Sequence, residues 1–168
     1  MGHNLGGERM RRRSGVIGMA VSVSMFMMGA AAWALQAGGV EVGDLESGSV
    51  VGQRFKELSV DLDIHATEIG GLKVLYPPVS VLDLKSRPGN PVLLRVTNRS
   101  TSERGFLMTT AANQAAPTVL NVQLVLKPGE SKYIGIPTSD LLYAAGATFV
   151  YRDHLNPKDP GGTLLLLK

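Results

Sequence analysis

The sequence predicts an all-β fold, a β-sandwich of short antiparallel strands preceded by one apolar N-terminal segment. Glycine and proline together make up 29 of the 168 residues (20 + 9), which favours many turns over long helices. The chain also contains a series of short apolar runs, and the clearest of them alternates between apolar and polar residues. A period of two is typical of a strand with one buried face.

Eight strand-like runs follow one another between residues 54 and 168. Turn residues separate them, as in Pro88-Gly89 and Pro128-Gly129, because proline restricts φ and glycine accepts positive φ. Short strands at near-regular spacing indicate an antiparallel sandwich with one core. One helical turn is expected within 139–145. The expected strands are 54–64, 79–84, 92–97, 105–109, 119–126, 133–136, 148–151 and 163–167.

An uncharged run from Gly15 to Leu35 is expected to cross a membrane as residues 15–37. About 20 apolar residues span a bilayer core of about 30 Å. Small residues four positions apart, such as Gly18 and Ser22, also let a neighbouring helix approach closely. The residues expected to form this anchor include Val16, Ile17, Gly18, Ser22, Phe26 and Trp33.

The basic residues before this run set the expected orientation. Residues 1–14 form a basic tail and should stay in the cytoplasm, so that the folded part lies in the periplasm as a single-pass inner-membrane protein. A cleaved signal peptide is the alternative, because 32–34 and 35–37 resemble small-residue cleavage sites. Residues 38–53 are rich in glycine and are expected to be a linker, which leaves 54–168 as the sandwich.

The distribution of charge excludes a nucleic-acid partner. The whole chain carries 17 basic and 14 acidic residues, a net charge of +3. Four arginines and Glu8 in the tail account for all of it (4 − 1 = +3), so the remainder is neutral (13 − 13 = 0). A neutral domain offers no basic face to phosphates.

The sequence offers no residues for the usual catalytic or redox centres. It has no cysteine, which removes thiolate ligands, iron–sulfur clusters and disulfides. It has no G-x-S-x-G, Walker or G-x-G-x-x-G motif. We therefore expect neither catalytic residues nor a cofactor, and a protein that is not an enzyme.

The order of several motifs resembles the cupredoxin family. The stretch 76–98, YPPVSVLDLKSRPGNPVLLRVTN, is similar to that family's strand, glycine turn and hydrophobic strand ending in Asn. Glu103–Phe106, the Pro128-Gly129-Glu130 turn and the closing pair of runs at 146–151 and 162–167 follow in the expected order. The resemblance covers about residues 55–168 and implies a Greek-key β-sandwich of the cupredoxin type.

The same resemblance implies that the copper ligands are absent. A type 1 copper site takes a thiolate, two imidazoles and a weak axial ligand. The corresponding positions fall at Arg104 for the first His, Arg152 for the Cys, Leu155 for the second His, and near Pro160 for the Met. These four residues are candidates for docking, and the two arginines are expected to pair internally with Glu103 and Asp153.

The sequence is consistent with two functions. The first is a non-catalytic accessory subunit that binds other membrane-protein subunits within a respiratory or photosynthetic electron-transfer complex, an expectation from analogy. The second is a periplasmic copper-binding or delivery protein with a displaced metal site near His154, with Asp153 and His65 as further ligands.

Overall fold

A computed structural model describes residues 39–85, 89–111, 120–144 and 146–167, together with Met1. The expected anchor, with Val16, Ile17, Gly18, Ser22, Phe26 and Trp33, lies outside the described residues. Among the residues that are described, no helix is both long and apolar enough to cross a membrane.

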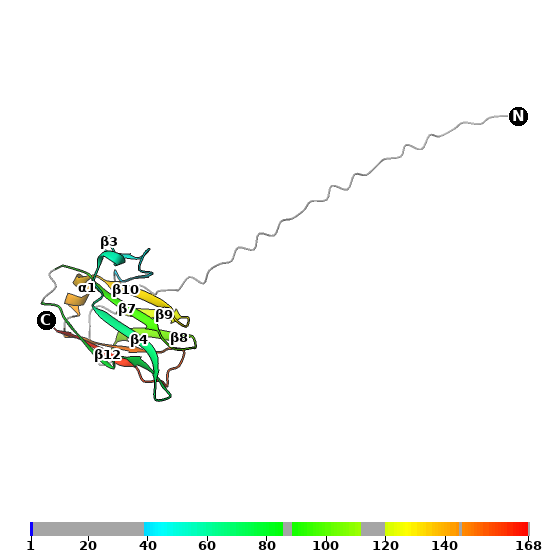
Figure 1. Cartoon of the computed structure of the whole chain (residues 1–168). Helices are drawn as coiled ribbons and strands as arrows, with labels where there is room; N and C mark the ends of the chain where they lie inside the picture. Colours follow the sequence, from blue (N-terminus) through cyan, green and yellow to red (C-terminus); the bar gives the residue numbers. More distant parts are fainter. Residues whose placement is uncertain (2–38, 86–88, 112–119, 145, 168) are drawn as a thin grey trace. The chain divides into compact units, whose positions relative to one another are not determined.

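Two five-stranded sheets form a β-sandwich, which confirms the predicted all-β fold (Figure 1). The first sheet has the order β1-β10-β7-β4-β5 and the second has the order β6-β12-β11-β8-β9. The first sheet contains β1 (Glu41–Gly43), β4 (Leu62–Ile69), β5 (Leu72–Tyr76), β7 (Val92–Asn98) and β10 (Ser131–Ile136). The second contains β6 (Val79–Asp83), β8 (Arg104–Thr110), β9 (Asn121–Leu126), β11 (Thr148–Arg152) and β12 (Gly162–Leu167).

The strand pairing is mixed, whereas the sequence predicted antiparallel strands. The pairs β4–β7 and β6–β12 are parallel, and the remaining pairs within the two sheets are antiparallel. Both exceptions join strands that are not consecutive in the chain. Parallel neighbours need a crossover connection, which local alternation cannot reveal.

Side chains that alternate along the strands fill the space between the sheets. On β7, for example, Val92, Leu94 and Val96 are fully buried in this core. The strand expected at 54–64 is displaced along the chain, because β4 begins only at Leu62 and continues to Ile69. Strand β5 (Leu72–Tyr76) was not predicted, since Lys73 and a preceding Gly70-Gly71 pair weaken the apolar pattern there.

Residues 38–53 contain strands, where the sequence suggested a linker. Strand β1 pairs with β10, and a small hairpin of β2 (Ser49–Val50) and β3 (Gln53–Arg54) leads into a 3₁₀ turn, η1 (Phe55–Glu57). Phe55 is fully buried and packs with Val50, Leu93 and Tyr133 on the outer face of the first sheet.

Glycines in this segment make room for the Phe55 ring. A Cβ at Gly48 would lie 2.2 Å from the ring, and one at Gly135 would lie 2.6 Å from it. The glycine-rich composition here therefore allows close packing, whereas a flexible linker had been inferred from it. The described chain enters the domain at Gly39, whose N–H donates to Asp140 of α1 (Thr138–Tyr143) at 2.9 Å.

Turn residues adopt the backbone conformations that the sequence predicted. Gly89 has φ of 81° and Gly129 has φ of 79°, and only glycine adopts this region without strain. Both ends of helix α1 (Thr138–Tyr143) lie within two residues of the ends of the predicted turn at 139–145.

Candidate functional site

One end of the sandwich brings together the start of β8 and the loop between β11 and β12. Asn98, at the end of β7, fixes the turn that leads into β8. Its Nδ2 donates to the carbonyls of Ser102 (2.8 Å) and Leu126 (2.9 Å), and its Oδ1 accepts from the N–H of Ser100 (2.9 Å). The turn places Arg104 at the first position of β8, pointing inward.

Arg104 forms the centre of a buried ion cluster with two aspartates of the β11–β12 loop. Its Nε lies 2.8 Å from Oδ2 of Asp153, and its Nη2 lies 3.0 Å from Oδ2 of Asp159. Arg104 and Asp153 are fully buried, while 23% of the Asp159 side chain is exposed. The internal pairing expected for Arg104 with Asp153 is therefore present.

The guanidinium of Arg104 contacts the two carboxylates as ion pairs, without the alignment of hydrogen bonds. They lie at short distance, but the guanidinium nitrogens have no well-aligned hydrogen-bond partner among the described residues. Burying such donors costs about 1–3 kcal/mol each, so the attraction between opposite charges must offset this cost. Removal of one partner from the ion cluster should therefore lower the stability of the folded protein strongly.

Asp153 organises the loop as well as neutralising Arg104. Its Oδ1 accepts from the N–H groups of Gly105 (2.8 Å), Leu155 (2.9 Å) and Asn156 (3.2 Å). Its Oδ2 also accepts from the side-chain amide of Asn156 at 3.0 Å. One carboxylate therefore ties the loop to the start of β8 and holds the turn at 153–156.

His154 lies against the backbone of β8. A Cβ on Gly105 would come within 2.6 Å of His154 Nδ1 and within 2.6 Å of Asp153 Oδ1, so only glycine fits at this position. The Nδ1 atom is buried and has no hydrogen-bond partner in the part of the chain that the structure describes. The proposed ligands His154, Asp153 and His65 are not brought together as a metal cluster. Within the described ranges, no three His, Cys, Asp or Glu side chains lie close enough to hold a metal ion.

The other predicted site residues lie around the same loop but not in the ion cluster. Arg152, at the end of β11, is exposed, and no ion pair with it is seen among the described residues. Leu155 has 45% of its surface exposed, and Pro160 is exposed farther along the loop. The expected internal pairing is thus found for Arg104 and not for Arg152.

An open apolar cavity adjoins Pro160 on the side of the sandwich. It has a volume of about 240 Å³. The main-chain N–H of Leu75 on β5 donates to the carbonyl of Pro160 at 3.3 Å, so the loop forms one wall. The cavity is lined by Ile69, Leu72, Val74, Leu75, Tyr76, Pro78, Pro160 and Gly161.

Close packing around Tyr151 supports that wall from inside. Its hydroxyl donates to the carbonyl of Pro77 and lies 3.4 Å from Ser80 Oγ, and burial raises the pKa of the Tyr151 phenol. A Cβ at Gly162 would come within 2.3 Å of the Tyr151 ring, and a Cβ at Gly161 within 2.2 Å of the Tyr151 main-chain oxygen. The two glycines therefore let the chain pass close to Tyr151.

The residues at the four ligand positions do not fit a copper ion. Arg104 is a buried cation already paired with carboxylates, and Leu155 and Pro160 carry no side-chain donor atom. Copper needs thiolate, thioether or imidazole ligands in a converging set. A positive guanidinium at the centre of the site would also repel a metal ion.

Comparison with known proteins gives distant structural likenesses. No family model and no curated protein matches the sequence. The chain is similar to a solved azurin (Az-iso2) from Methylomonas sp. strain J. The identity is 9%, the match covers 66% of this chain and 100% of that chain, and the TM-score is 0.47.

Two multicopper oxidases are also similar. The oxidase mgLAC has 14% identity and a TM-score of 0.41, and the match covers 63% of this chain and 38% of that chain. The oxidase McoA from Aquifex aeolicus has 10% identity and a TM-score of 0.43, with 72% and 33% covered. This chain thus spans about a third of the length of each oxidase.

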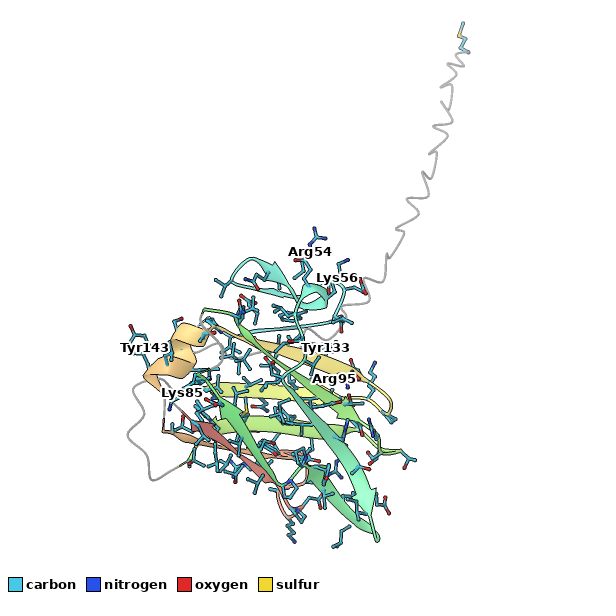
Figure 2. All side chains as sticks on the ribbon, turned by 60° about the vertical axis from the view of Figure 1, so that its left-hand side comes forward. Arg54, Lys56, Lys85, Arg95, Tyr133 and Tyr143 are labelled. Atoms are coloured by element: carbon cyan, nitrogen blue, oxygen red, sulfur yellow. The ribbon has the colours of Figure 1, made fainter. Side chains whose placement is uncertain are left out.

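The outer face of the first sheet carries a separate polar row. Asp63 on β4 pairs with Arg95 on β7, which lies opposite Tyr133 on β10 (Figure 2). The Asp63 carboxylate raises the pKa of Arg95. Nδ1 of His65 lies 3.6 Å from Oδ1 of Asp63, and burial lowers the pKa of His65, with the Asp63 charge opposing and Arg99 and Arg95 adding to the shift.

Sequence reasoning missed Asp159 and the polar row. The role of Asp159 was not predicted, because its contact with Arg104 depends on how the loop closes. The pairing of Asp63 with Arg95 was not predicted either. The position of Asp63 directly opposite Arg95 follows from the parallel β4–β7 pairing, which the sequence did not reveal.

Proposed function

We propose that this chain is a non-catalytic, membrane-anchored subunit with a copper-free, cupredoxin-like domain in the periplasm. It would stabilise or dock other membrane-protein subunits of a larger inner-membrane complex, with respiratory or photosynthetic electron transfer as the class that the sequence resemblance suggests. One observation carries the proposal. The ion cluster of Arg104, Asp153 and Asp159 occupies the end of the sandwich where the resemblance places copper ligands.

The ion cluster supports a structural role for this end of the domain. A metal ion in such a loop would hold the loop in place, and here a buried arginine and two aspartates do so. The loop then presents Arg152, Leu155 and Pro160 to solvent beside an apolar cavity. A fixed loop with exposed apolar side chains suits recognition of another protein.

The test is purification of the tagged full chain from its native membrane in mild detergent, followed by native mass measurement. We expect stoichiometric copurification of other membrane subunits. Leu155→Asp should reduce it, because it places a charge on the proposed docking surface. Val51→Asp is the matched control, since Val51 is 70% exposed on the separate β2–β3 hairpin. A chain that carries no other subunit would contradict the proposal.

A further inference from the structure

Strand β6 ends the second sheet and turns apolar side chains to solvent. Val79 is 58% exposed and Val81 is 56% exposed. Ser80, which lies between them, and Leu82, which follows Val81, are buried. Strand β6 pairs with β12 on one side only within the described sheet. Its other side is an edge, where main-chain N–H and C=O groups face outward.

The edges of natural sheets usually carry features that block pairing with another chain. Two of the other terminal strands have such features: β5 carries Lys73, and β1 is only three residues long and includes Glu41. Strand β9 turns the uncharged Asn121 and Gln123 outward. The one charge of strand β6 is the exposed Asp83 at its last residue; from Val79 to Leu82 it has no charge and no proline, and its register with β12 continues without a bulge.

The apolar surface continues from β6 across the neighbouring strands. Val81 lies opposite Leu165 of β12, and Val79 lies opposite Thr163, which lies opposite Val150 of β11. At these positions the outer face of the sheet is therefore aliphatic or threonine, and the charged Asp83 and Arg152 lie only at the ends of β6 and β11. Apolar surface of this extent beside an open edge is typical of an interaction site.

We propose that a second copy of this chain pairs antiparallel with β6, so that the two five-stranded sheets become one continuous sheet. A strand edge is complementary to itself under a two-fold axis, because each N–H of one copy meets a C=O of the other. The main-chain groups of the β6 edge can therefore be paired by the same groups of a second copy. The side chains of Val79, Ser80 and Val81 are short and uncharged, which also allows two copies to approach closely.

The side chains favour one register, with Ser80 opposite Ser80 of the other copy. This register puts Val79 beside Val81 of the second copy, so that both outward pairs are aliphatic. A shift of two residues, the next register that keeps the same side chains on the outer face, would put Val79 beside Asp83, an aliphatic side chain beside a carboxylate. Pro77 and Pro78 lack the main-chain N–H and end the new pairing just before the strand.

The absence of cysteine from the chain allows a direct crosslinking test. Full-length Val79→Cys and Val81→Cys proteins are mixed in mild detergent and oxidised. We expect a disulfide-linked dimer that forms in the mixture at least about tenfold more than in either variant alone, because only the mixture places the two thiols directly opposite. Gln123→Cys on β9, mixed with Val81→Cys, is the control and should not crosslink.

Analytical ultracentrifugation of the full-length chain gives a second readout. Val81→Lys should weaken the dimer at least about tenfold, since a charge on an edge strand blocks pairing. Val125→Lys, on the outer face of β9 and 41% exposed, should leave it unchanged. Both changes lie on solvent-facing positions, and circular dichroism checks the fold. A monomer, or a dimer that Val81→Lys does not weaken and that crosslinks no better than the control, would overturn the proposal.

Discussion

At the scale of single residues, Arg104 is the centre of the ion cluster at this end of the sandwich. It is fully buried, and its charge is balanced by Asp153 and Asp159. A buried cation of this kind is stable only while its partners remain, because an unpaired buried charge costs several kcal/mol. Arg104 therefore forms a structural ion cluster with these two aspartates at this end of the sandwich.

Replacement of Arg104 by Met tests this cluster. We expect a loss of about 3–5 kcal/mol in the free energy of unfolding, because the change leaves two carboxylates without their cation. Urea denaturation measures it. Arg152→Met is the matched control: it removes an arginine from an exposed position nearby and should change stability by no more than about 0.5 kcal/mol. Equal stability of both variants would contradict the role of the ion cluster.

His65 gives a prediction about pH. Burial lowers its pKa below the ordinary 6.5, so the folded protein binds the proton less tightly than the unfolded chain does. Protonation therefore favours unfolding, and the stability present at higher pH declines as the pH falls below 6.5. His65→Gln should remove this part of the decline in urea titrations between pH 8 and pH 5. An unchanged pH dependence in the variant would show that other groups cause it.

At the scale of elements, the segment before β4 belongs to the sandwich. Strand β1 extends the first sheet, and η1 packs Phe55 onto that sheet's outer face. The prediction of a linker at 38–53 was wrong for two reasons. Strands of two or three residues are too short to show a period, and the many glycines suggested flexibility. The longer strands β7 and β8 and the core strand β12 were predicted because their apolar patterns are long enough to recognise.

Phe55→Ala tests whether this segment is part of the folded unit. We expect a loss of about 3–5 kcal/mol in the free energy of unfolding, since the ring is fully buried among Val50, Leu93 and Tyr133. Val51→Ala, at an exposed position of the same segment, should have little effect. If both variants unfold at the wild-type urea concentration, the segment contributes nothing to the core.

At the scale of the whole molecule, the sequence and the structure agree on an all-β sandwich. The motif order indicated where copper ligands would lie, and this placed Arg104 and the loop after Arg152 at one end. The Arg104–Asp153 pair could be expected because the resemblance placed Arg104 and the chain around Arg152 and Asp153 at the same end of the sandwich. The pairing of Asp159, the side cavity and the open β6 edge could not, since each depends on strands and loops that meet only after folding.

The central claim is that this domain is copper-free. Its most direct test is a copper titration of the purified chain, followed by calorimetry and by the visible absorption spectrum. The account predicts no stoichiometric copper binding and no blue absorption in either the wild type or His154→Ala, because Arg104, Leu155 and Pro160 supply no ligand. One equivalent of copper bound by the wild type and lost in His154→Ala would contradict it.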